Sequence, residues 1–173
     1  LSSKIEHDQL RLAALRALSS VGDASVVPML LEAIYAGGQQ GAAAREALEA
    51  TFAKGVDERL LQAFRQAGTP EQQATIVEIL DRRRAVAAIP LLLELAAGEN
   101  ADLRRRAFAS LARLASQSEV PPMIQALLKL TDRREREDAE KAIAAVCGRI
   151  SEPDEWVVWV LAVFGGSAPA EQL

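Results

Sequence analysis

One pattern recurs five times along the chain, at a spacing of about 31 residues. Aligned on an apolar anchor, the copies follow one another at steps of 30, 32, 31 and 32 residues. The anchors are Leu18, Leu48, Leu80, Leu111 and Ile143. Four residues before them lie Ala14, Ala44, Ile76, Ala107 and Ala139. Self-similarity at this period is the signature of stacked supersecondary units, so the pattern predicts an array of helical hairpins.

The composition favours helices over strands. Half of the 173 residues are hydrophobic and only 4% are aromatic, with alanine and leucine supplying most of the apolar bulk. Both residues cost little free energy in a helix. The longest uncharged apolar run, Trp156 to Phe164, is far shorter than the roughly 20 residues that span a bilayer. We therefore predict an all-α, soluble protein without a membrane segment.

Each copy is expected to contain a first helix, a short turn, a second helix and a longer link to the next copy. In the first copy, Gly22 and Asp23 form the turn. Proline recurs near the start of the second helix, where its missing N–H is harmless. These prolines are Pro28, Pro90, Pro121 and Pro153. The expected caps before three of them are Asp23, Ser118 and Ser151.

The expected links contain turn-forming residues, at 37–41, 68–70, 98–100 and 131–132. In the second link, Thr69 is predicted to cap the next helix, with Pro70 in its first turn and Gln72 reaching back. Asp132 has the same spacing to Glu135. We interpret these residues as structural.

The repeat resembles the HEAT repeat, in the short bacterial form of about 30 residues that is similar to phycobilisome-lyase HEAT-like repeats. The resemblance is clearest from Ala14 to Leu31, in Ala-x-x-x-Leu, Gly-Asp and Val-Pro-x-Leu-Leu. The second copy departs by lacking proline, and the third has Asp81–Arg84 in place of Gly-Asp. The resemblance implies a right-handed α-α superhelix, an α-solenoid, with first helices outside and second helices on the concave side. It also implies binding to proteins or other macromolecules.

We predict one HEAT-repeat domain over residues 1–173. The apolar segment Trp156–Phe164 is expected to be the last second helix, and it offers a surface for self-association. Residues 165–173 resemble the second link, so we expect them to begin a sixth repeat and the polypeptide to continue beyond Leu173. The five predicted repeats cover residues 8–37, 38–68, 69–98, 99–131 and 132–164.

The sequence offers few groups for catalysis or metal binding. His7 is the only histidine, so neither a usual zinc ligand set nor a nucleophile–imidazole pair is available. No phosphate-binding glycine motif occurs. We expect no catalytic residue, metal or cofactor. Cys147 is the only cysteine and is expected to be a buried thiol, which slightly favours a cytoplasmic location without assigning one.

Arginine is the one polar signal. Two interpretations stay open: a ridge that binds phosphates or an acidic partner, and a solvated surface of ion pairs. Intermixed carboxylates favour the second. A net charge of −4, without a basic face, makes nucleic acid an unlikely partner. The arginine clusters are Arg82, Arg83 and Arg84, then Arg104, Arg105 and Arg106, then Arg133, Arg134 and Arg136.

We therefore expect a noncatalytic scaffold that binds another protein, or a neighbouring domain of the same polypeptide, through its concave face and loops. Two alternatives remain: a nucleic-acid-binding protein like the alkylpurine glycosylases, and a bilin lyase-like chaperone. The candidate contact residues on the second helices are Met29, Arg59, Gln62, Leu91, Glu94 and Gln125.

Overall fold

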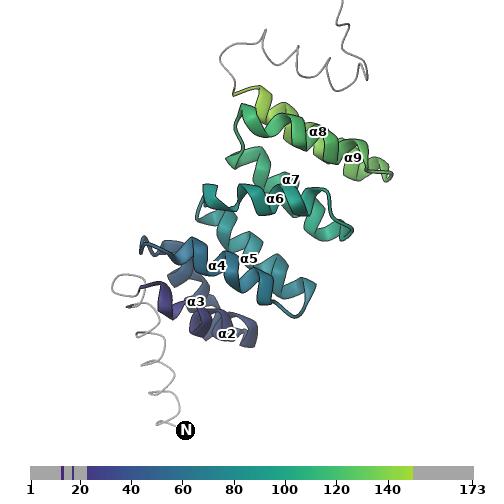
Figure 1. Ribbon diagram of the computed structural model, residues 1–173. Coiled ribbons are helices and arrows are strands. Elements are labelled where there is room, and N and C mark those ends of the chain that lie inside the picture. Colours follow the sequence, from purple (N-terminus) through teal and green to yellow (C-terminus); the bar gives the residue numbers. More distant parts are fainter. Residues whose placement is uncertain (1–12, 14–16, 18–22, 150–173) are drawn as a thin grey trace, which may run out of the picture. The chain divides into compact units, whose positions relative to one another are not determined.

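The computed structural model describes Ala13, Ala17 and residues 23–149. The chain divides into two compact units, Leu1–Ala88 and Ile89–Leu173, and each is described by itself. Every regular element of the described residues is helical (Figure 1). The prediction of an all-α fold is therefore confirmed. Trp156–Phe164 and the expected start of a sixth repeat at 165–173 lie outside the described residues.

The first unit contains two layers of helices. The second helices α2 and α4 pack against each other in one layer, and the first helices α3 and α5 pack against each other in the other. Contacts between α2 and α3 and between α4 and α5 join the layers. The elements are η1 (Ala24–Val26), α2 (Val27–Ala36), α3 (Gly38–Ala50), α4 (Val56–Gln66), α5 (Pro70–Arg82) and η2 (Val86–Ala88).

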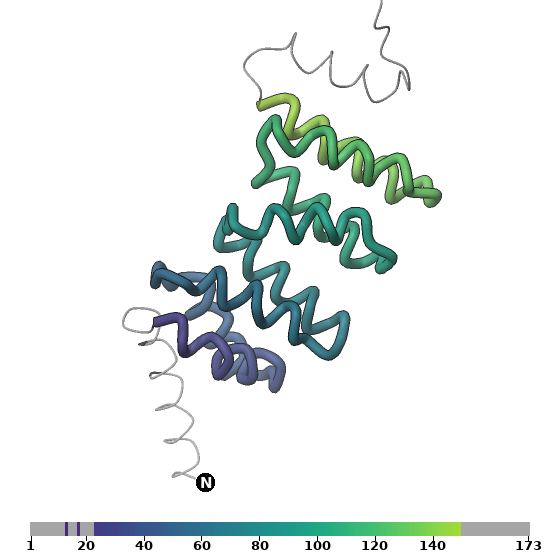
Figure 2. The backbone as a smooth tube through the Cα atoms, in the orientation of Figure 1, coloured from purple at the N-terminus to yellow at the C-terminus, as the bar shows by residue number. Residues whose placement is uncertain are grey.

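The second unit has the same pairing of helices within it. Helices α6 and α8 pack together, α7 packs on α9, and contacts between α6 and α7 and between α8 and α9 join the layers. The path of the chain back and forth through these helices can be followed in Figure 2. Each unit thus has the packing of an α-solenoid. The elements are α6 (Ile89–Ala96), α7 (Ala101–Leu114), η3 (Gln117–Glu119), α8 (Val120–Leu128) and α9 (Arg133–Cys147).

The repeat columns form the core of both units. The anchors Leu48, Leu80 and Leu111 have no exposed surface, and Ile143 is 8% exposed. The residues four positions earlier are fully buried as well. This spacing places both columns on one face of each first helix. Small alanines in one column let neighbouring first helices approach closely.

The predicted caps of the first helices are confirmed. The Thr69 hydroxyl accepts a hydrogen bond from the Gln72 N–H, and the Gln72 side chain accepts one from the Gly68 N–H. Asp132 accepts from the Glu135 N–H at 2.9 Å. Asn100 caps α7 in the same way. These bonds satisfy donors that the first turn of a helix leaves free.

The second helices begin in the predicted way with one correction. Pro28, Pro90 and Pro121 lie in the first turns of α2, α6 and α8, and each of these helices follows a short 3-10 turn. Ser118, however, does not cap α8. Ser116 instead caps η3, the 3-10 turn before α8, and its N–H donates to the Glu119 carboxylate at 2.7 Å. Ser118 only adds a hydroxyl bond to the same carboxylate.

The first link between copies is shorter than expected. We predicted a link over residues 37–41, but α2 and α3 are separated by Gly37 alone and α3 begins at Gly38. Gly37 turns the chain with a φ of 77°, which favours glycine. Gly41 then lies against α2, because a Cβ at this position would stand 2.9 Å from the Ala33 carbonyl oxygen. Because Gly41 has no side chain, α2 and α3 can pack in direct contact although only one residue connects them.

Substitution Gly41→Ala tests this close contact. Alanine favours a helix by about 1 kcal/mol over glycine, so an unconstrained site would gain stability. Here the added methyl meets backbone that must shift, and we expect a net loss of about 1–2 kcal/mol in unfolding free energy. Urea denaturation would measure it. Gln39→Ala, at an exposed position of the same helix, is the matched control, and equal stabilisation of both variants would contradict the contact.

Candidate interaction surface

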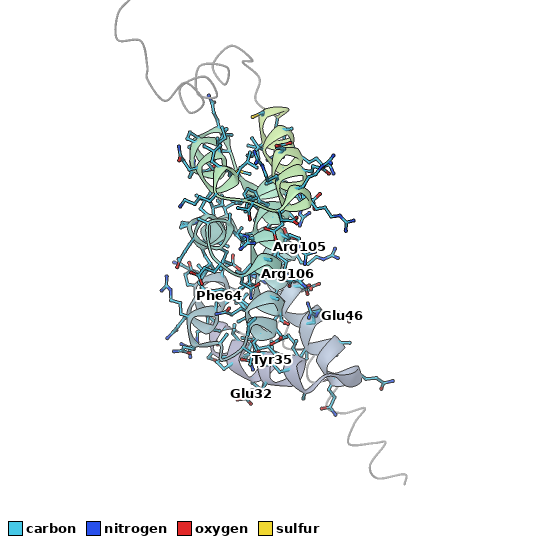
Figure 3. The ribbon with its side chains drawn as sticks, turned by 90° about the vertical axis from the view of Figure 1, so that its right-hand side faces the viewer. Glu32, Tyr35, Glu46, Phe64, Arg105 and Arg106 are labelled. Atoms are coloured by element: carbon cyan, nitrogen blue, oxygen red, sulfur yellow. The ribbon has the colours of Figure 1, made fainter. Side chains whose placement is uncertain are left out.

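In the first unit, the predicted contact residues of the second helices are exposed. Met29 on α2 is 49% exposed, and Tyr35 on the same helix is 38% exposed. Arg59 and Gln62 lie on α4 and are exposed as well. The Arg59 guanidinium donates to the Gln62 side-chain oxygen at 2.6 Å. Because α2 packs beside α4, these residues belong to one helical layer, part of which is shown in Figure 3.

In the second unit the candidates differ in exposure. Glu94 on α6 and Gln125 on α8 are exposed, whereas Leu91 is half-buried. Leu128, which the sequence did not single out, is 46% exposed at the end of α8. We use the name second-helix surface for these positions within each unit separately: Met29, Tyr35, Arg59 and Gln62 in the first unit, and Leu91, Glu94, Gln125 and Leu128 in the second.

Arg83 has an internal role. Its Nε donates to Asp57 Oδ1 at 2.6 Å, and its Nη1 donates to the carbonyl oxygens of Leu48 and Thr51 at 2.5 and 2.6 Å. The side chain is only 8% exposed. These carbonyls end α3, where a helix leaves acceptors without partners. Arg83 therefore caps the preceding first helix and is not available to an external anion.

The two neighbours of Arg83 are exposed. Arg82 is the last residue of α5. Arg84 has a φ of 53°, in the left-handed region where side chains are disfavoured. The Ala85 N–H bonds to the Leu80 carbonyl and the Arg84 N–H to the Asp81 carbonyl. This is a Schellman helix end, and glycine is the usual residue at the position of Arg84.

Arg104 joins two first helices. Its Nε and Nη2 donate to Glu135 Oε2 at 2.9 and 2.7 Å, and its Nη1 donates to the carbonyls of Gly98 and Glu99. Both side chains are less than one-fifth exposed. Arg45 and Glu78 make a more exposed version of this pair, between α3 and α5. Arg104 is thus a positioning residue for neighbouring repeats.

The remaining arginines of the second cluster pair within their own helix. Arg105 and Arg106, labelled in Figure 3, both contact Asp102, at 3.0 and 2.8 Å. The hydrogen bond from Arg106 lowers the pKa of the Asp102 carboxyl, and the charges of both arginines act in the same direction. Arg133 pairs with Glu137 one turn away. Such exposed pairs are typical of a solvated helix face.

The three arginine clusters do not lie at equivalent places in their helices. Arg82 is the last residue of α5, and Arg83 and Arg84 follow it, whereas Arg104–Arg106 and Arg133 lie near the N-terminal ends of α7 and α9. The first cluster therefore lies at the end of a first helix, and the other two lie near the beginning of one.

Arg149 repeats the role of Arg83 in the second unit. Its guanidinium donates to the carbonyl oxygens of Ala112 and Ala115, at the end of α7. It also donates to the Ala145 carbonyl of α9. The nearby Cys147 is half-buried, and burial raises the pKa of its thiol above the ordinary value. This cysteine is therefore poorly suited to act as a nucleophile.

The second unit contains a hollow that is smaller than a typical ligand pocket. This hollow of about 130 Å³ is lined by Gly98, Arg104, Lys129 and Thr131, among others. Ligand pockets usually measure roughly 300–1,000 Å³. No group of three metal-ligating side chains occurs in the part of the chain described. In the same part, no helix is both long and apolar enough to cross a membrane.

The phenylalanines differ in exposure. Phe64 and Phe108 lie in the core. Phe52 is 101% exposed, in the turn between α3 and α4. It follows the last turn of α3, whose C-cap is Thr51, and so lies beyond the reach of the helical stripe. The position of Phe52 just after the last repeated apolar position of this helix was the feature of the sequence that could have indicated its exposure.

A family profile described as HEAT repeats matches residues 58–161, more than half of the chain. Together with the layered packing of the helices, this match identifies the class, and the chain belongs to the HEAT-repeat family. Neither a comparison with curated proteins nor one with solved structures found a match. The family places the protein among repeat scaffolds, which are generally interaction modules.

Substitution Arg83→Met tests the internal role of this arginine. Methionine keeps much of the stem but leaves the carbonyls of Leu48 and Thr51 without their donor, and Asp57 without its partner. We expect a loss of about 2–3 kcal/mol in unfolding free energy. Arg82→Met, one residue away at an exposed position, should change it by less than about 0.5 kcal/mol. Chemical denaturation of both variants would decide, and equal losses would contradict the cap.

Proposed function

We propose that this protein is a noncatalytic HEAT-repeat scaffold that binds another protein, or a neighbouring domain of its own polypeptide, through the second-helix surface. The observation that carries the proposal is the exposure of large apolar side chains on second helices that also supply apolar residues to the core. Met29 and Tyr35 are exposed on α2, while Val27, Leu30 and Leu31 of the same helix form core.

The chemistry of the surface supports a protein partner. On α2, the exposed Glu32 lies between Met29 and Tyr35 along the chain. Arg59 and Gln62 lie on the adjacent helix α4. Apolar and aromatic side chains surrounded by polar groups are typical of protein interfaces. The hydrogen-bonding groups of Glu32, Arg59 and Gln62 also favour a partner that has polar side chains. In the second unit, Leu128 supplies an exposed apolar group near Gln125 on α8.

Site-specific photo-crosslinking tests the proposed surface. A photoreactive amino acid at Gln62 or Gln125 should capture a defined protein partner in cells of the native host. The same group at Glu46 on α3 or Glu140 on α9, which are exposed positions of first helices, should not. Capture of a protein partner from a second-helix position, and not from the first helix of the same unit, would support the proposal, whereas equal capture from the first helices would contradict it.

A charge placed on α2 provides the second measurement. Met29→Glu should reduce capture at Gln62 at least about fivefold, because a carboxylate in an apolar contact must lose its hydration. Circular dichroism should stay unchanged, since Met29 is not part of the core. Capture that is insensitive to this substitution would place the contact elsewhere.

Duplex DNA distinguishes the main alternative. With few unpaired cations and a net charge of −4, we expect no binding of a labelled duplex to the whole chain at low salt. Fluorescence anisotropy would measure it. Binding that weakens steeply with salt concentration would instead indicate phosphate contacts and would favour the nucleic-acid hypothesis.

A further inference from the structure

Two turns of the first unit expose large apolar side chains that the core does not use. Phe52, in the turn of residues 51–55, is 101% exposed, and Val86, in η2, is 65% exposed. A buried phenylalanine stabilises a fold by removing apolar surface from water, and Phe52 contributes none of this to its own unit. Neither residue belongs to the second-helix surface.

Arg83 holds the two turns together. Its guanidinium bonds to the carbonyl oxygen of Thr51, the residue immediately before Phe52. Val86 follows Arg83 by three residues, and η2 packs on α4, which begins where the first turn ends. Both turns lie at the same end of the helices, on the left in Figure 1. Phe52 and Val86 therefore lie on one edge of the unit.

The exposed charged residues of these turns are cationic. Residues 51–55 contain Lys54, and residues 82–88 contain Arg82, Arg83 and Arg84. Lys54, Arg82 and Arg84 are exposed. In the part of the chain that the structure describes, ion pairs form at other cations and not at these three. The edge is positive although the whole chain carries a net charge of −4.

This edge differs from the other arginine clusters. Arg105 and Arg106 share Asp102, and Arg133 has Glu137, so their charges are compensated within one helical turn. Beside the edge, the Asp57 carboxylate is bound to Arg83. Exposed cations next to exposed apolar groups are complementary to a partner that carries carboxylates beside an apolar side chain.

We propose that the turn edge, defined as Phe52, Lys54, Arg82, Arg84 and Val86, binds an acidic peptide segment of a partner protein that contains a large apolar side chain. The apolar side chain covers Phe52 and Val86, and the carboxylates bind the guanidinium groups of Arg82 and Arg84, which suit bidentate contacts. A nucleic-acid strand fits less well, because only one ring is available for base stacking and an aliphatic residue lies beside it.

A labelled peptide tests the proposal with the whole 173-residue chain. The probe is a fluorescein-labelled peptide of aspartate and glutamate around a central Leu-Phe pair, and anisotropy measures its dissociation constant. We expect binding at low salt and weaker binding at about 0.5 M salt, where charges are screened within a few ångströms. A peptide of the same charge with glycine in place of Leu-Phe should bind several-fold more weakly.

Two variants separate binding from folding. Phe52→Ser should raise the dissociation constant about tenfold, as loss of a central apolar contact does, while Phe52→Leu should largely preserve it. Arg84→Gly should raise it about fivefold and also raise the melting temperature, because glycine fits the left-handed backbone at this position. Arg134→Ala, which removes an exposed arginine of α9, should leave peptide affinity unchanged.

Three outcomes would overturn the proposal. The first is no binding at low salt, or equal affinity of the wild-type, Phe52→Ser and Arg84→Gly proteins. The second is tighter binding of a single-stranded oligonucleotide that displaces the peptide, which would assign the edge to nucleic acid. The third is self-association of the chain in sedimentation experiments that is lost in Phe52→Ser, which would make a second copy the occupant. None of these outcomes bears on the second-helix surface, so failure here leaves the proposed scaffold function to its own test.

Discussion

Contact between successive first helices is the constraint on which each unit depends. Helices α3 and α5 meet in the first unit, and α7 and α9 meet in the second. Their shared face carries fully buried residues four positions apart, such as Ala44 with Leu48 and Ala107 with Leu111. A single helical hairpin leaves this face in water, so each repeat is stable only when the next one covers it. The stability of the fold therefore increases with each contact between neighbouring repeats, and the apolar pattern must recur in the sequence to form these contacts.

Stacking creates a second requirement at the ends of the first helices. Covering a helix end removes water from carbonyl groups that have no partner within the helix. Arg83 supplies donors to the end of α3, and Arg149 supplies them to the end of α7. Each arginine follows the next first helix along the chain and reaches back by one repeat. The repeat that buries the apolar face of the preceding first helix thus also donates hydrogen bonds to the carbonyl groups at the end of that helix.

The parts of the fold that depend on local chemistry were predictable from the sequence. The period, the columns and the caps at Thr69 and Asp132 all follow from residues close together in the chain. The parts that depend on distant neighbours were not. Arg83 looks like its exposed neighbours Arg82 and Arg84 in the sequence, and only the arrival of a helix end from more than thirty residues earlier distinguishes it. Gly41 was similar: in sequence it indicates a loop, but contact with α2 makes it part of a helix.

Functional positions were harder to predict because the columns describe only what is buried. The second-helix candidates were chosen as the positions of these helices that are not part of the predicted core. The turn edge was missed, yet it coincides with the two departures from the repeat: the copy without proline contains Phe52, and the copy without Gly-Asp contains Arg84. A turn that no longer has to meet the common pattern can accept an exposed ring or a disfavoured backbone angle at small cost to the stack. In a repeat protein, a departure from the consensus that leaves the core intact is therefore a better guide to specific binding than the consensus itself.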